Sequence, residues 1–390
     1  MINNTLDCTG CNACVQKCPN NCISLEENQY GFLFPKVDKT NCISCNLCNN
    51  VCHLQNYIQQ DRINSTAYAA VHKDKRIVLK STSGGVFSAI AEKILSDGGA
   101  VYGCAFDKEL KPHHVRVDNI TQLNLLYGSK YIQSDINNCY NDILKDLNKK
   151  RVVFFTGTPC QVAGLKTFLG KDYDCLFTAD LICHGVPSYA YFRKFIKWYE
   201  EKNNCKIVDY SFRSKDNAGW SLAGTYTIER DNKKTTKKVF YFDNYYYHYF
   251  LNGDIYRDSC YNCKYANIYR SGDFTLGDLW GAEKIKPDFN IDNGCSLLLV
   301  NSSKGEKLLK SINLDLQKIS LDLALHNNEQ LHTSSKKSLY RNEILEEYCN
   351  YSAEQIQKNY IKRYRIIRII ARMKYLVPKK IRYIMLKNRK

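Results

Sequence analysis

The order of apolar and polar positions divides the chain into a short N-terminal part and a longer part that mixes strands and helices. From Thr66 onward, short apolar runs bounded by turn residues alternate with segments of helical periodicity. We predict strands at 66–71, 99–106, 151–155, 175–183 and 296–301, and helices at 83–95, 159–169, 188–202 and 303–312. Three alternating stretches within 207–242 predict an antiparallel part.

These patterns suggest three regions. Residues 1–56 form a compact, cysteine-rich unit, and the polar residues 57–65 read as a linker. The mixed body covers residues 66–350, and a basic tail covers residues 351–390. We therefore expect an α+β protein with a small N-terminal domain, a larger mixed α/β domain and a helical tail.

The N-terminal unit contains one cysteine spacing, C-x2-C-x2-C-x3-C, in two copies. The first copy comprises Cys8, Cys11, Cys14 and Cys18, followed by Pro19, and the second comprises Cys42, Cys45, Cys48 and Cys52, followed by His53. This spacing is typical of bacterial dicluster ferredoxins, in which the fourth cysteine of each run binds the other cluster. We predict one 4Fe-4S cluster on Cys8, Cys11, Cys14 and Cys52, and a second on Cys42, Cys45, Cys48 and Cys18.

Cysteine pairs at this spacing also suit zinc, so a pair of zinc sites is the alternative. His53 replaces the usual proline, and we expect this change to affect the turn and not the ligands. Cys22 is not needed by either ligand set. We interpret it as a small buried residue or, at most, a substitute ligand.

Composition supports metal ligation over disulfide bonding. The chain has 19 cysteines, an odd number, and they are densest near the N-terminus. The chain opens without a basic segment followed by an apolar one, and no run of 18 apolar residues occurs. We therefore expect a cytoplasmic protein without a membrane-spanning helix.

The positive charge is concentrated in the tail. The net charge is +17, and residues 355–390 contribute 13 Lys or Arg and no Asp or Glu, which leaves about +4 for the rest. A nucleic-acid enzyme more often spreads its basic residues over a folded face, so we expect no nucleic-acid partner.

Within the tail, helical spacing places apolar residues on one face beside three arginines. The apolar set is Ile366, Ile369, Ile370, Met373, Leu376 and Val377, and the basic set is Arg365, Arg368 and Arg372, with Pro378 ending the helix. Such a helix suits peripheral contact with an anionic membrane surface. Packing of the apolar face on the body and an acidic groove on a partner are the alternatives.

Four body cysteines lie at the ends of predicted elements. Cys160 follows the strand-to-helix junction at 156–159, Cys183 ends a strand, and Cys260 and Cys263 share one loop. They could hold a third 4Fe-4S cluster, a zinc ion, or only an activated Cys160 thiolate. We expect the remaining cysteines to pack as small hydrophobic residues: Cys104, Cys139, Cys175, Cys205, Cys295 and Cys349.

Two glycine-bearing helix starts, 83–85 and 156–159, could bind phosphate through backbone N–H groups, although simple capping is the usual explanation of such a start. Lys130 could contact a cofactor or be solvated. His184 could transfer protons near a cofactor, or it could be a capping or core histidine. Asp273 and Asp278 could bind hydroxyl groups or satisfy a turn.

Seven body segments, taken in order, resemble the beta-subunit family of coenzyme F420 hydrogenases and dehydrogenases. They are 81–90, 127–135, 154–166, 181–188, 212–220, 260–281 and 294–305. The resemblance implies FAD and a further 4Fe-4S cluster in the body, but not a deazaflavin substrate. On this basis we place FAD near Ser83, Gly84, Gly85, Lys130, Thr156, Gly157 and Thr158. The cluster would use Cys160, Cys183, Cys260 and Cys263.

The resulting hypothesis is an iron–sulfur flavoprotein oxidoreductase. Electrons would pass between a redox carrier protein or soluble donor, the clusters and a flavin that acts on a small-molecule substrate. Some relatives of this kind accompany polysaccharide-synthesis enzymes. The alternatives are a non-catalytic electron-transfer subunit that docks on a catalytic chain and a redox-sensing module. No catalytic residue stands out.

Overall fold

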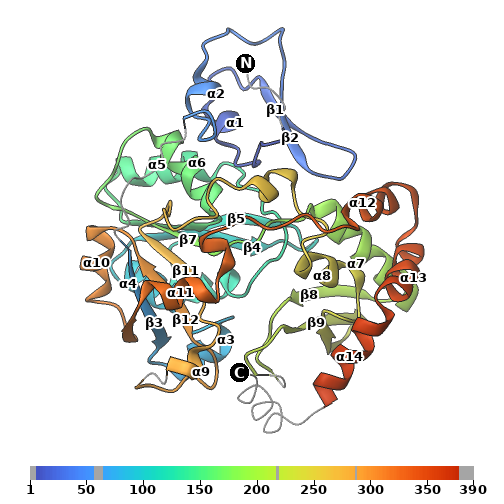
Figure 1. Ribbon diagram of the computed structural model, residues 1–390. Helices are drawn as coiled ribbons and strands as arrows, with labels where there is room; N and C mark the ends of the chain where they lie inside the picture. The colour runs from blue at the N-terminus through green and yellow to red at the C-terminus, as the bar shows by residue number, and fades with distance from the viewer. Residues whose placement is uncertain (1–5, 57–64, 217–218, 286–287, 377–390) are drawn as a thin grey trace.

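The computed structural model describes residues 6–56, 65–216, 219–285 and 288–376. A small N-terminal unit sits on top of a larger body (Figure 1). It contains α1 (Ala13–Lys17), β1 (Ile23–Glu27), β2 (Leu33–Val37) and α2 (Leu47–Asn50), with β1 and β2 paired antiparallel. The predicted linker lies outside the described residues except for Ser65.

An eight-stranded mixed sheet forms the centre of the body, in the order β13-β3-β12-β11-β7-β6-β4-β5. The strands are β3 (Thr66–His72), β4 (Ala100–Phe106), β5 (Pro112–Val117), β6 (Val153–Gly157), β7 (Leu176–Leu181), β11 (Phe274–Asp278), β12 (Ser296–Val300) and β13 (Leu314–Ile319). Strands β4, β6, β7 and β11 are parallel, and the other pairings are antiparallel. The carboxyl ends of the parallel strands therefore meet at one edge, where ligands of such sheets bind.

Helices cover both faces of this sheet, and the strand residues alternate between them. Phe154 of β6 packs with α4 (Val86–Ser96) and α10 (Ser303–Leu309). Val153 and Phe155 point the other way and pack with α5 (Cys139–Asn148) and α6 (Pro159–Leu169). This alternation is the expected period of two for a strand buried on both faces.

A second lobe has an aromatic core. Its antiparallel sheet consists of β8 (Lys206–Ser211), β9 (Ala223–Arg230) and β10 (Lys233–Phe240). The surrounding helices are α7 (Tyr189–Asn203), α8 (Tyr245–Leu251), α12 (Arg341–Asn350), α13 (Ala353–Arg363) and α14 (Arg365–Leu376). Tyr245, Tyr246 and Tyr247 of α8 are fully buried among residues of α7 and α13.

Short elements connect these parts: α3 (Lys75–Lys80), α9 (Ala282–Ile285), α11 (Leu321–His326), and the 3-10 turns η1 (Ile120–Leu126), η2 (Asp258–Asn262) and η3 (Glu329–Leu331). No helix in the described part of the chain combines the length and apolarity needed to cross a bilayer.

The predicted fold class is confirmed: a mixed α/β body follows a ferredoxin-like N-terminal region, and the tail is helical. The apolar strands and helices that we predicted are present, with ends shifted by a few residues. Polar strands were not predicted, notably β5 and β13 at the sheet edges and β11 in its interior. Their short, mixed sequences become strands only because neighbouring strands pair with them.

Candidate metal centres

The two cysteine runs share one backbone conformation. Asn12 and Asn46, each the residue after the second cysteine of its run, have positive φ angles of 62° and 61° and precede α1 and α2. Asparagine tolerates this left-handed conformation better than most residues. The turn places the third cysteine of each run, Cys14 or Cys48, in the first turn of a helix. The sequence repeat is therefore also a structural repeat.

Four cysteines from both runs lie together on the side of the N-terminal unit that faces the body. Burial, together with the neighbouring Cys8 and Cys52 thiols, raises the pKa of Cys14 to about 12. Burial also raises the pKa of Cys11, with Cys14 and Cys8 acting in the same direction. Cys52 of the second run thus lies beside the first three cysteines of the first run. We call this group site I.

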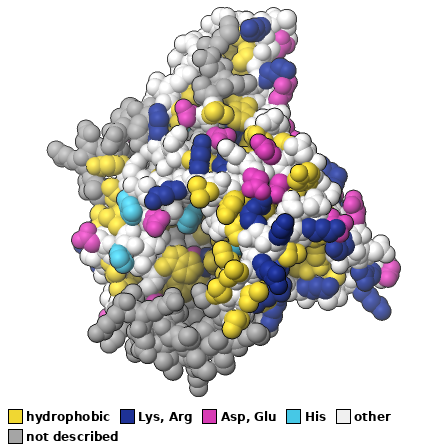
Figure 2. All heavy atoms as spheres, turned by 45° about the vertical axis from the view of Figure 1, so that its right-hand side comes forward, with side chains coloured by type: hydrophobic (Ala, Val, Ile, Leu, Met, Phe, Trp, Pro, Cys, Tyr) yellow, Lys and Arg dark blue, Asp and Glu magenta, His cyan; other side chains and the backbone are white. Residues whose placement is uncertain are grey.

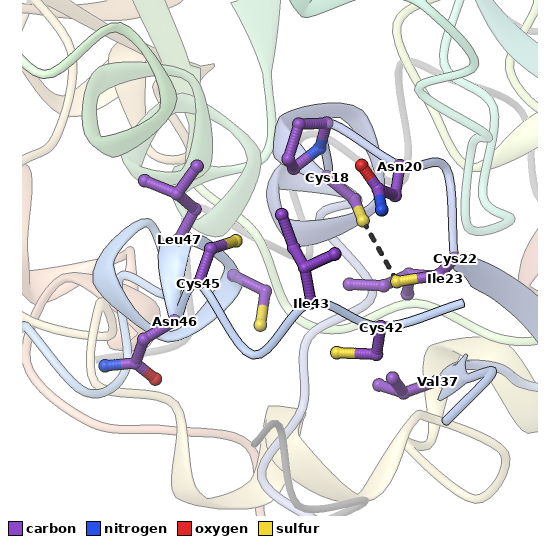
Figure 3. A pocket seen from close by; sticks show the side chains of 12 residues that line it. Cys18, Asn20, Cys22, Ile23, Val37, Cys42, Ile43, Cys45, Asn46 and Leu47 are labelled. Atoms are coloured by element: carbon purple, nitrogen blue, oxygen red, sulfur yellow. Dashed lines mark hydrogen bonds between the residues drawn. The ribbon is translucent and has the colours of Figure 1, made fainter. Parts of the chain in front are cut away.

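A second group of cysteines lines a small cavity at the outer end of the N-terminal unit. Its thiols are Cys18, Cys22, Cys42, Cys45 and Cys48, which we call site II (Figure 3). The fourth cysteine of the first run has therefore crossed to the second run. Cys22 lies in the same cavity, with its Sγ 3.3 Å from the Sγ of Cys18.

The body brings Cys160, Cys183, Cys260 and Cys263 together in site III. Cys160 lies in the first turn of α6, whose start is fixed by Pro159 and by a capping box between Thr158 and Gln161. Cys183 follows β7, and the other two lie at η2. Burial raises the pKa of Cys183 well above its usual value, and the Cys260, Cys160 and Cys263 thiols add to this effect.

The cysteines of each site are not arranged around a single ion. Burial raises the pKa of six thiols in sites I and III, so a metal must displace their protons when it binds: Cys11, Cys14, Cys160, Cys183, Cys260 and Cys263. Within the described ranges, no three His, Cys, Asp or Glu side chains approach closely enough to hold a single ion. In a cubane cluster each thiolate binds a different iron, so its four sulfur ligands lie further apart than those around one zinc ion.

The three sites form a line from the outer end of the N-terminal unit into the body. Sites II and I are adjacent, because Cys48 is close enough to contribute to the pKa of Cys14. Sites I and III are adjacent through α6: a Cβ on Gly164 would lie 3.0 Å from the Cys11 Sγ, and Cys160 is one turn earlier on that helix. Cys160 also contributes to the raised pKa of Cys11.

His53 joins the N-terminal unit to the body. Its buried ring contacts the Thr9 hydroxyl at 3.0 Å and the Tyr265 hydroxyl at 2.6 Å. Thr9 follows the first cysteine of site I, and Tyr265 lies two residues after the last cysteine of site III. The histidine in place of the usual proline therefore does more than shape a turn.

The residues predicted to hold FAD lie along the carboxyl edge of the sheet, and several of their donors are already used. The Gly84 amide donates to the Ser296 hydroxyl at 2.8 Å, and the Ser83 hydroxyl donates to the Cys295 carbonyl. The Thr158 amide donates to Gln161 at 2.9 Å.

Of the other predicted flavin residues, Lys130 and Thr156 are also engaged in contacts within the protein. The Lys130 ammonium donates to the carbonyls of Leu125 and Tyr127, and burial lowers the pKa of this lysine. Gly85 has a positive φ of 89° and precedes α4. Thr156 and Gly157 end β6, and the Thr156 carbonyl contacts the His114 ring. None of these contacts forms a ready phosphate cradle.

The two aspartates around β11 have different surroundings. Asp273 lies before the strand, at the opposite edge, and accepts from the Thr178 amide and hydroxyl, so it is structural. Asp278 ends the strand at the carboxyl edge, where it pairs with the buried Arg213 and accepts from the Trp220 indole at 3.1 Å. Burial lowers the pKa of the nearby His184, and Asp278 opposes this shift.

The remaining cysteines are mixed in burial. Cys139 and Cys295 are buried and Cys104, Cys175 and Cys205 partly so, but Cys349 is exposed, contrary to our prediction for that residue. Sequence reasoning also missed Gly164 and Arg257, which connect the two domains. A glycine inside an apolar helix was the only signal for Gly164. Arg257 carried none, because its role depends on the tertiary structure.

A 4Fe-4S dicluster domain is matched by residues 7–56. Residues 150–321 match the C-terminal part of the family described as "Coenzyme F420 hydrogenase/dehydrogenase, beta subunit". A structure of the F420-reducing [NiFe] hydrogenase complex from Methanosarcina barkeri is similar at 15% identity and a TM-score of 0.43, covering 76% of this chain and 93% of that chain. No curated protein matches the chain significantly.

The duplicated cysteine fold and the dicluster match define the class: this is an iron–sulfur protein of the electron-transfer type. Residues 150–321 of the body match the C-terminal region of the coenzyme F420 hydrogenase/dehydrogenase beta subunit, so this part of the chain is similar to that family.

Proposed function

We propose that the chain is an oxidoreductase that passes electrons between an external one-electron carrier and a small substrate through three 4Fe-4S clusters. The ligands would be Cys42, Cys45, Cys48 and Cys18 in site II, Cys8, Cys11, Cys14 and Cys52 in site I, and Cys160, Cys183, Cys260 and Cys263 in site III. In this organisation residues 1–56 are the ferredoxin domain, 66–350 the body and 351–390 the tail.

The observation that carries this proposal is the contact between Cys11 and Gly164, which puts site I one helical turn from Cys160. Electrons would enter at site II, where Cys45 is exposed, and continue through site I to the buried thiols of site III. Bound clusters supply one-electron chemistry, whereas the surrounding residues hold the thiolates, exclude water and fix the spacing.

The test is metal and sulfide analysis of the anaerobically purified chain. We expect about twelve iron and twelve sulfide per chain, from three four-iron clusters. Replacing Cys260 and Cys263 by serine should remove a third of both, whereas replacing the exposed Cys349 should remove none. Stoichiometric zinc without sulfide would refute the proposal.

We also propose that FAD binds the body at the carboxyl edge, as the family resemblance implies. Bound FAD would supply exchange between one-electron and two-electron chemistry. The predicted residues fit it only in part, because the Gly84 and Thr158 amides already donate within the protein. Asp278, Arg213 and Trp220 at the same edge offer further polar and aromatic groups. Denaturing the protein should release FAD. A protein with its full iron and sulfide content but no flavin would refute the proposal that FAD binds the body.

The second candidate is a non-catalytic subunit that docks on a separate catalytic chain. Turnover by the isolated chain with an artificial one-electron donor would favour the enzyme over the non-catalytic subunit. A link to polysaccharide synthesis stays a prediction from relatives.

A specific observation favours peripheral membrane contact by the tail. Five large apolar side chains of α14 are exposed to between 48% and 73%: Ile366, Ile367, Ile369, Ile370 and Met373. They do not pack on the body, contrary to the alternative that we considered. The body instead contacts the arginines: Arg368 donates to the Phe242 carbonyl at 2.8 Å, and Arg372 pairs with Asp243 at 3.0 Å.

Hydrophobic and basic side chains lie side by side on the face shown in Figure 2. An exposed apolar face this close to so many basic groups fits the interface of an anionic bilayer. We propose that the tail attaches the protein reversibly to such a surface.

A further inference from the structure

Arg257 of the body is inserted into the contact with the N-terminal unit. The residue directly precedes η2, and its backbone carbonyl accepts from the Cys260 amide at 2.9 Å. It is fully buried, and its guanidinium carbon lies 4.1 Å from the centre of the Phe34 ring in β2. The charge therefore sits between a site III loop and the ferredoxin-like domain.

Every hydrogen-bond acceptor around this guanidinium is neutral. Its Nε donates to the Cys8 carbonyl at 2.5 Å, and its two terminal nitrogens donate to the Leu33 carbonyl and the Gln133 side chain. Among the residues that the structure describes, no carboxylate lies within ion-pair distance of Arg257. By contrast, the buried Arg213 and Arg270 each pair with an aspartate.

An unpaired buried charge is strongly unfavourable, and arginine does not escape the penalty by losing its proton. We therefore expect a negatively charged group close to the Arg257 guanidinium. The available partners are the cysteines on either side of Arg257. On one side, the Arg257 backbone carbonyl accepts from the Cys260 amide at 2.9 Å, which holds the residue against the site III loop. On the other side, the guanidinium holds the backbone of Cys8.

We propose that Arg257 is the shared counter-ion of the clusters in sites I and III and raises the reduction potential of both. This inference rests on the proposed function, since it needs those two clusters. Reduction adds one electron from the external carrier and makes or breaks no bond. The added negative charge is stabilised by a cation fixed in a medium of low dielectric constant. The guanidinium keeps its proton throughout, so this stabilisation needs no proton uptake.

The test is a redox titration of the full-length, cluster-loaded chain followed by electron paramagnetic resonance, with R257Q and R257K compared with the wild type. The clusters are assigned to sites beforehand through single cysteine-to-serine variants. R257Q should make reduction at sites I and III at least about tenfold less favourable, which is ~59 mV for a one-electron couple. R257K keeps the charge and should stay near the wild-type values.

Two controls make the result specific. Site II is not in contact with Arg257, so its potential should be unchanged in both variants. R363Q removes a partly buried arginine that has its own carboxylate partners, Glu343 and Glu347, and should leave all potentials unchanged.

Equal loss of potential in R257Q and R257K would show a structural docking role and overturn the inference, as would unchanged potentials in R257Q. Failure of the proposed function is a separate result, because the wild-type protein would then lack iron and sulfide at sites I or III.

Discussion

Cys11 of the ferredoxin-like domain packs directly on Gly164 of α6. A Cβ on Gly164 would lie 3.0 Å from both the Cβ and Sγ of Cys11, and 3.1 Å from the Tyr140 hydroxyl. A side chain at this position would force the Cys11 loop or the Tyr140 hydroxyl to shift by a few tenths of an ångström. Because Cys160 is one turn earlier on α6, this contact sets the distance between sites I and III.

The first prediction is that G164A separates these two sites. Alanine favours a helix over glycine by about 1 kcal/mol, but overpacking of the Cys11 contact should outweigh this by costing about 1–3 kcal/mol. We expect a lower unfolding midpoint and slower reduction of site III through site I, measured by rapid mixing with a one-electron donor. K166A on the same helix is the control. Wild-type kinetics and stability in G164A would contradict the prediction.

The cysteine spacing predicted which cysteines lie together better than it predicted their surroundings. Ligand spacing is a local property, so Cys8, Cys11 and Cys14 could be grouped from the sequence alone. The roles of Arg257 and His53 depend on how two domains far apart in the sequence meet. The same limit applies to β11, whose short sequence gives no strong strand signal outside the sheet.

The second prediction concerns Cys18 and Cys22, whose sulfur atoms are 3.3 Å apart. C22S should leave the iron and sulfide content of site II unchanged, because Cys18 is the proposed ligand. C18S should keep a site II cluster with an altered paramagnetic spectrum, since Cys22 already lines the same cavity. The double variant should lose this cluster while sites I and III remain. If C22S alone removes it, the roles of the two cysteines are reversed.

The third prediction is a loss of stability in mild acid. Burial lowers the pKa of His248 to about 4, and the Arg368 charge acts in the same direction. The unfolded chain, with a histidine pKa of about 6.5, therefore binds more protons than the folded chain between pH 6.5 and 4. The stability contributed by the neutral ring is complete above this range and is lost as the pH falls through it.

From pH 7 to pH 5 this histidine should account for about 2 kcal/mol of lost stability. H248F should weaken the pH dependence of the urea unfolding midpoint, whereas H326N at an exposed position should not. The buried His114 has a pKa shifted in the same direction and should keep part of the dependence in H248F. An identical pH profile in H248F and the wild type would refute the assignment.

The tail shows where sequence periodicity was informative and where it was not. The spacing correctly predicted a helix, found at Arg365–Leu376, although its last predicted residue, Val377, and the basic segment after it lie outside the described residues. Periodicity alone could not tell which face meets the body. The structure turns Ala371, a small residue, toward the body, together with contacts from Arg368 and Arg372.

The last prediction is salt-sensitive binding of the full chain to vesicles that contain anionic lipid. Each basic residue near such a surface contributes ~1 kcal/mol, weakened by salt, and the exposed isoleucines add a modest apolar term.

The comparison should be a chain ending at Tyr364, because Ile356 and Tyr360 of α13 belong to the core and must stay. I366N/I370N in the full chain keeps every charge and should lose most of the binding. In flotation, we expect the wild type to rise with anionic vesicles, the shortened chain to stay behind, and neutral vesicles to recruit neither. Binding of the shortened chain equal to that of the wild type would refute membrane attachment through α14, and undiminished binding of I366N/I370N would show that charge alone is responsible.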